Sequence, residues 1–200
     1  MTKQRGKGKR ILTIIACLLL LLFLCAADSF ESVPVRAVYV ICPAFDADDV
    51  NKLMEHVKYS FVAVVEGVCR TEYEAEGWPM PTTIYTVRVL ENIKGVLPTD
   101  GTIEIAKYGG VSENKKHFYM QEDDMFPAAG HTYVFNVFAG NGRIPLASMG
   151  SRSVIPVEEH IHEQLQNGGV LQEVLDTSEV VRRYRAAYQA VTAGAHSSDG

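Results

Sequence analysis

The middle of the chain carries four stretches whose apolar pattern is typical of β-strands. Residues 61–69 form an almost continuous apolar run rich in β-branched side chains, which predicts a central strand. Residues 83–90 and 102–108 alternate between apolar and polar positions, and Gly130 introduces a further apolar stretch over 131–138, which together predict three more strands. The period of two therefore indicates a mainly β core.

Turn residues divide these strands and suggest two additions. Gly140-Asn141-Gly142 is a hairpin signal, and residues 143–146 begin a returning strand. Pro145 lacks an amide hydrogen, so we expect that strand at a sheet edge. Residues 151–155 predict one more extended stretch.

A helical period appears on both sides of this β region. Val50, Leu53, Met54 and Val57 share one face of a helix predicted within residues 43–60, which Asp46 or Asp48 would cap. Past Pro156 the pattern predicts a helix ended by Asn167-Gly168-Gly169. A second helix over 170–191 is interrupted at 176–179, where Thr177 or Ser178 can cap a fresh start.

The first 27 residues have the pattern of an export signal. Five basic residues precede an unbroken apolar run over 11–27, which ends in Cys25-Ala26-Ala27. Cleavage after Ala27 would release the chain, and retention of the run would leave a short membrane anchor. A lipid anchor at Cys17 is the least favoured alternative, because the apolar run continues past it. We therefore expect a secreted protein, or one on the extracytoplasmic face of the cell membrane.

Charge changes the picture once the leader is set aside. The chain has 19 basic and 24 acidic residues, and the leader holds five of the basic ones and none of the acidic ones. The remainder therefore carries a net charge of −10. Nucleic acids and anionic membranes bind basic surfaces, so both are excluded as partners, apart from a membrane contact through residues 11–27 if they are uncleaved.

No cluster of residues has the spacing of a known catalytic or metal site. His160 and His162 stand two apart on a predicted helix, so they point to different sides and we expect surface histidines. Glu122-Asp123-Asp124 lacks the alternating oxygen ligands of a calcium loop. Ser148-Met149-Gly150-Ser151 is not a nucleophile elbow, and Cys69 has no histidine in its segment. We expect no catalytic residue, cofactor or metal.

The order of these features resembles a known module. Cys42 and a short helix precede the strand at 61–67, the next strand ends in Lys94-Gly95, the third ends in Gly109-Gly110, and Ala129-Gly130-His131 introduces the fourth, Tyr133-Val134-Phe135. Residues 42–149 thereby resemble the netrin-like module, the OB-fold barrel of tissue inhibitors of metalloproteinases and their bacterial relatives. In those bacterial proteins, valine–glycine–valine, valine–lysine–glycine and glycine–x–x–tyrosine–leucine–x–phenylalanine strands recur in this order.

Two departures limit what the resemblance implies. The animal inhibitors have several disulfides, whereas only Cys42 and Cys69 follow the leader here. Those inhibitors also grip zinc through an N-terminal cysteine. Cys42 lies 14 residues beyond Asp28, so its nitrogen is an ordinary amide after cleavage at Ala27. Inhibition of a metalloprotease by this route is not expected.

The expected fold is mostly β with α: an OB-like antiparallel barrel of five to six strands, with one N-terminal helix and a C-terminal helical extension. The expected segments are a signal peptide or anchor (1–27), a linker (28–41), the barrel (42–155), helices (156–191) and a disordered tail (192–200).

Two functions remain open. The first is a binding or interaction module for a protein or peptide, without activity of its own, that presents loops 70–82 and 111–128. Its candidate contacts are Trp78, Phe118, Tyr119 and Phe126, although Trp78 has a second interpretation as a lid over the core. The alternative is an exported hydrolase whose site forms only in three dimensions.

A disulfide between Cys42 and Cys69 is the first prediction that can be tested. The helix and strand between the two residues can return one end to the other, although two separate thiols are an equal alternative. If the cysteines pair, alkylation of the exported chain without reductant leaves both unmodified in mass spectrometry. Two alkylated cysteines would contradict the pairing.

Overall fold

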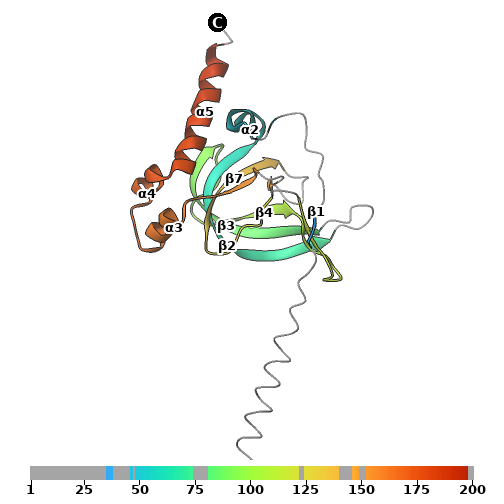
Figure 1. Ribbon diagram of the computed structural model, residues 1–200. Helices are drawn as coiled ribbons and strands as arrows, with labels where there is room; N and C mark the ends of the chain where they lie inside the picture. The colour runs from blue at the N-terminus through green and yellow to red at the C-terminus, as the bar shows by residue number, and fades with distance from the viewer. Residues whose placement is uncertain are drawn as a thin grey trace, which may run out of the picture. The chain divides into compact units, whose positions relative to one another are not determined.

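The protein is described here by a computed structural model (Figure 1). The described residues are 35–37, 46, 48–73, 81–121, 124–139, 146–148 and 152–197. The chain divides into two compact units, Met1–Pro34 and Val35–Gly200, and all of the described residues belong to the second. The predicted leader, Cys42, Trp78 and the hairpin turn at 140–142 lie outside the described residues.

The main sheet consists of the strands that the sequence predicts. Antiparallel pairing joins five strands in the order β9–β7–β2–β3–β4. Their bounds are β2 Tyr59–Tyr73, β3 Pro81–Lys94, β4 Thr102–Tyr108, β7 Thr132–Ala139 and β9 Val154–Pro156. β2 and β3 are longer than the patterns indicate. Residues 70–73, expected in a loop, continue β2 and pair with β3.

A short strand, β8 (Leu146–Ser148), lies between β7 and β4. It pairs antiparallel with the end of β7 and parallel with the end of β4, through two residue pairs on each side. The expected return of the chain alongside β7 is therefore confirmed. The expectation that this strand is an edge is wrong, because β8 has a neighbour on both sides. The pairing here is short, so the main element is an antiparallel sheet bridged by β8.

A small second sheet includes part of the loop expected over residues 111–128. It is formed by β1 (Val35–Ala37), β6 (Phe118–Met120) and β5 (Gly110–Val111), in that order. β1 lies in the segment expected to be a linker. Gly109 and Gly110 have φ angles of 112° and 123°, and a Cβ on Gly109 would lie 2.5 Å from the Tyr119 carbonyl oxygen. The glycine pair thus permits the sharp change of direction between β4 and β5.

The N-terminal helix α2 (Val50–His56) is shorter than the predicted segment. The Asp49 side chain accepts hydrogen bonds from the amides of Asn51 and Lys52, at 3.0 and 3.4 Å, and so caps the helix. Val57 is already extended, with φ −70° and ψ 145°. The helix ends there because Tyr59 begins β2. Ser60, expected in the helix, is buried in the strand and bonds to Asn136 at 2.8 Å.

Three helices follow the sheet: α3 Glu159–Gln166, α4 Leu171–Thr177 and α5 Glu179–Ser197. The predicted interruption is confirmed, and Ser178 is the capping residue, because its hydroxyl accepts from the Val181 amide at 3.1 Å. α5 runs past residue 191, where the pattern had led us to expect a tail. Of the helices that the structure describes, none combines the length and the apolar character needed to cross a membrane.

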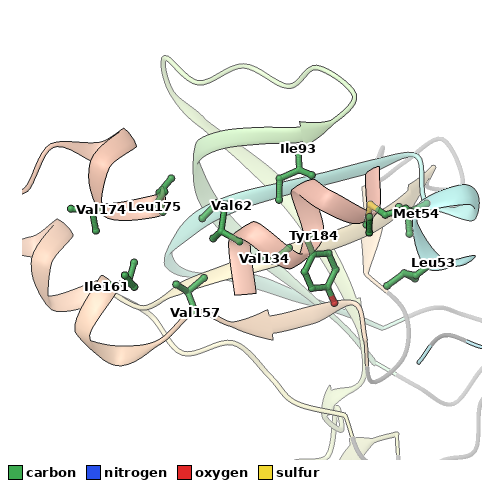
Figure 2. Close-up of a cluster of buried hydrophobic side chains, with 13 residues drawn as sticks. Leu53, Met54, Val62, Ile93, Val134, Val157, Ile161, Val174, Leu175 and Tyr184 are labelled. Atoms are coloured by element: carbon green, nitrogen blue, oxygen red, sulfur yellow. The ribbon is translucent and has the colours of Figure 1, made fainter. Parts of the chain in front are cut away.

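Both faces of the main sheet are covered, and the core has two parts. One face of β2, β3 and β7 packs inward around Phe61, Phe135 and Val87. The opposite face carries Val62 and Val134, which meet side chains from the helices (Figure 2). The helix side chains in this outer cluster include Leu53, Met54, Ile161, Val174, Leu175, Val181 and Tyr184. Burial on both faces explains why residues 61–65 have no polar alternation.

A buried ion pair interrupts the inner apolar cluster. Lys107 shares a face of β4 with Ile105, and its Nζ lies 2.7 Å from Asp124 Oδ2 and 3.2 Å from Ser153 Oγ. The two charged side chains are only 1% and 2% exposed. Burial lowers the pKa of Lys107, against the opposing effect of Asp124. Asp124, considered above as a calcium ligand, is thus the partner of a lysine.

Loss of one partner of this pair is expected to cost stability. Lys107→Met leaves the Asp124 carboxylate buried without its cation, which should lower the free energy of unfolding by about 3–5 kcal/mol. Urea denaturation measures the change. The double variant Lys107→Met/Asp124→Leu is the control, since removal of both charges should recover most of the loss. A double variant as unstable as the single one would contradict this account.

Glu158 joins the end of the sheet to the start of α5. Its carboxylate accepts from the Ser178 hydroxyl at 2.6 Å and from the amides of Glu179 and Val180 at 2.7 and 3.1 Å. Burial raises the pKa of Glu158, but these hydrogen bonds outweigh burial, and the pKa lies below its ordinary value. The charged form therefore stabilises the fold.

The Glu158→Gln variant is expected to lose about 1–2 kcal/mol of unfolding free energy at neutral pH, as other lost helix caps do. The pKa of Glu158 is lower in the folded state than in the unfolded state. Its carboxylate therefore makes its full contribution to the unfolding free energy above the unfolded pKa. This contribution disappears as pH falls through the folded pKa, below about pH 4.3. Denaturation at a series of pH values should show a wild-type decline in this window that the variant lacks. Parallel curves would contradict the prediction.

Candidate functional site

A cavity lies between the outer face of β2 and β3 and the turn from α3 to α4. Its volume is about 410 Å³. Val64, Leu90, Leu165 and Leu171 supply apolar walls, and His162 and Gln166 supply polar groups from α3. We call this cavity the β2–α3 groove. Its size and mixed lining are typical of a ligand site.

The groove opens where the pairing of β2 with β7 ends. The last hydrogen bonds between the two segments join Val65 to His131 and Gly130, at 3.0 and 2.7 Å. Gly130 has a φ of 80° and ends the contact by turning the chain away. β2 then continues to Tyr73, and within the described part of the chain its only strand neighbour is β3. One edge of β2, over residues 66–73, is therefore unpaired by any described strand.

An ion pair lies on the same sheet face. Glu66 of β2 and Arg88 of β3 approach to 3.0 Å, and both side chains are about half exposed. Such a pair contributes little to stability. It does place one charge of each sign on the lining of the groove, where hydrogen-bonding groups of a ligand can reach them.

A histidine is buried at the polar side of the groove. His162 is 6% exposed, and its Nδ1 lies 3.3 Å from the Thr132 hydroxyl oxygen. The Gln166 amide nitrogen lies 2.9 Å from His162 Nε2. Because an amide nitrogen only donates, this arrangement assigns the ring proton to Nδ1, facing Thr132. Two hydrogen bonds therefore fix the orientation of the imidazole.

Two further groups with metal-binding atoms surround this histidine. The ring of His131 stacks on that of His162, with centroids 4.8 Å apart. Glu159 Oε2 lies 3.8 Å from His131 Nδ1. One ligand atom from each of the three residues lies within 4.8 Å of the others. We call this group the His131–Glu159–His162 cluster.

The expectation of a surface position for His162 is wrong. His160 is exposed, as expected, but His162 lies on the buried face of α3 beside Ile161. His160 and His162 do point to different sides, so the argument against that pair stands. The partner that sequence reasoning missed is His131, which comes from the start of β7. The spacing of Glu159 and His162, three apart on one helix face, was the available signal.

The aromatic candidates of loop 111–128 lie in a different part of the molecule. Phe118 and Phe126 are half-buried, and their rings meet edge to face with centroids 5.0 Å apart. Phe126 also packs against the inner core. Tyr119 is half-buried and contacts the ring of His117. The structure thus brings Phe118 and Phe126 together as packing residues, and neither lines the groove.

Cys69 lies on the exposed end of β2 as a free thiol. Its sulfur is 3.5 Å from Arg70 Nη1 and from Glu104 Oε1. The Arg70 hydrogen bond to Glu104 lowers the pKa of that carboxyl, which makes it a weak base. Neither contact supplies a histidine base beside the sulfur. Its pairing with Cys42, which lies outside the described residues, stays a prediction.

No protein-family model matches this chain. A search of curated proteins also finds no significant match.

Proposed function

We propose that this chain is an extracytoplasmic binding module that takes an extended segment of a protein partner in the β2–α3 groove. The observation that carries the proposal is the position of the groove beside the unpaired edge of β2. The proposed module has no catalytic activity of its own.

The unpaired edge supports a peptide in extended form. The segment that leads into β7 pairs with β2 only as far as Val65, through His131 and Gly130. A strand added beside residues 66–73 would lie on the same side of β2 and would form backbone hydrogen bonds with it. Alternate side chains of that strand would point toward the groove. Its apolar walls fit apolar side chains, and Glu66 and Arg88 fit polar ones.

We also propose that the fold is of OB type and netrin-like. The strand order β7–β2–β3–β4, with β8 between β7 and β4, supports this proposal for residues 42–149. The sheet is not closed into the expected barrel, because β8 pairs with each neighbour through only two residues. The N-terminal α2 and the helices after β9 are in the expected order.

The proposed location rests on the sequence. The basic and apolar residues of the first 27 positions support export, and the charge of −10 on the remainder supports a soluble domain with a partner other than nucleic acid. A protein or peptide partner outside the cytoplasm agrees with both.

The exported hydrolase remains the second candidate, and the His131–Glu159–His162 cluster is the observation in its favour. A covalent mechanism needs a nucleophile beside the histidine. The hydroxyl beside His162, that of Thr132, is buried, and no described residue that lines the groove carries a hydroxyl or a thiol. Binding is therefore the function that the groove supports better.

The groove can be tested with a matched pair of surface variants. Leu171 lines the groove and Val96 follows β3, and the two side chains are 38% and 86% exposed. In cross-linking capture from a cell-envelope extract, Leu171→Asp should reduce the recovered partner at least tenfold. A carboxylate buried against apolar contacts costs roughly 2 kcal/mol or more, and 1.4 kcal/mol is a factor of ten.

The control Val96→Asp makes the same change of charge away from the groove and should leave capture unchanged. Circular dichroism checks that both variants are folded. Equal capture by Leu171→Asp and the wild type, or no enriched partner with the wild type, would contradict the proposal.

A further inference from the structure

We propose that His131, Glu159 and His162 form a zinc site beside the β2–α3 groove. The proposal goes beyond the binding function and does not depend on it. It follows from the donor set, the position of the three residues on rigid elements, and the cavity that reaches His162.

The donor set selects the kind of metal. Two imidazoles and one carboxylate are common ligands of Zn²⁺ when a fourth position is left open. Mg²⁺ and Ca²⁺ prefer sites made entirely of oxygen atoms, so they fit this cluster poorly. Several divalent metals take nitrogen ligands. Of these, Zn²⁺ is not redox-active and has no geometric preference from its d electrons, so it places few demands on the protein.

The three ligands come from two well-held elements. Glu159 and His162 are one turn apart on α3, so both project from the same side of the helix. His131 directly precedes β7, and its carbonyl oxygen is anchored by the amide of Val65 at 3.0 Å. The backbone therefore brings the three side chains together, with one ligand atom of each within 4.8 Å of the others.

Only side-chain motion is needed to reach a bound geometry. Ligand atoms around a tetrahedral zinc ion lie about 3.3 Å apart, because each bond is roughly 2.0–2.1 Å long. The present atoms lie within 4.8 Å of one another, so the largest gap must close by about 1.5 Å. His131 and Glu159 have exposures of 44% and 67%, which leaves their side chains room to rotate.

The buried histidine already has the support that metal ligands require. Thr132 and Gln166 each contact one nitrogen of His162. Zinc would replace one of these two contacts, and the other would continue to orient the ring, as outer hydrogen bonds do in metal sites.

An open coordination position would face the groove. Three protein ligands leave the fourth place of a tetrahedral ion for water or for an oxygen of a bound molecule. His162 lines the groove, so the cavity is a path by which the ion and such a molecule arrive. The chemical class that fits this position is a carboxylate or another oxygen donor.

Metal titration of the purified full chain tests the site. Calorimetry with Zn²⁺, after alkylation of the cysteines, should give one ion per chain. His131→Ala and Glu159→Gln should each weaken binding at least tenfold, which is the lower limit seen when even an outer hydrogen-bonding partner is lost. Both side chains are partly exposed, so these variants should fold, and circular dichroism checks that they do.

His160→Ala is the matched control, because His160 lies on the same helix but outside the cluster. It should bind zinc like the wild type. Co²⁺ in place of zinc should give the strong visible absorption of a four-coordinate site in the wild type and in His160→Ala, but not in the two cluster variants. A wild type without tight binding, or cluster variants that bind equally well, would overturn the proposal.

Leu171→Asp separates this proposal from the binding function. The variant is expected to lose partner capture and to retain its zinc affinity, since Leu171 is not a ligand. Loss of zinc binding by His131→Ala with unchanged partner capture would support the metal site alone.

Discussion

The structure depends on the antiparallel pairing of β2 with β7, because both apolar clusters pack against these two strands. Residues on one face, such as Phe61 and Phe135, form the inner core, and Val62 and Val134 on the other face meet the helices. Burial of both faces of a sheet demands a second layer. The helices after β9 supply that layer, so they belong to the same core as the strands.

Polar contacts hold this second layer in position. Glu158 caps the start of α5, and further along the same helix Arg185 forms two hydrogen bonds to Glu91 of β3, at 2.7 and 2.6 Å. A bidentate pair fixes direction as well as distance. The helix is thus bonded at its start to the segment that follows β9, and further along to β3. These two contacts fix the position of the apolar side chains between them.

The candidate sites arise where this regular packing ends. β7 begins at Thr132 while β2 continues to Tyr73, so part of β2 is left without a second strand neighbour among the described residues. The turn between α3 and α4 stands over this part of the sheet, and the groove lies between them. The same change of direction at Gly130 brings His131 against α3. One local feature therefore places both the proposed binding groove and the proposed zinc ligands.

The sequence by itself determined the secondary structure well, because periodicity reports which faces of an element are buried. It predicted the strands of the main sheet, though not those of the small one, and it predicted the interruption at 176–179 with Thr177 or Ser178 as its cap. It did not predict that Lys107 points into the core or that His162 is buried, since each depends on a partner distant in the chain, Asp124 or Thr132. Local pattern determines local structure, whereas the surroundings of a polar side chain, and with them its chemistry, are decided only when the sheet and helices pack together.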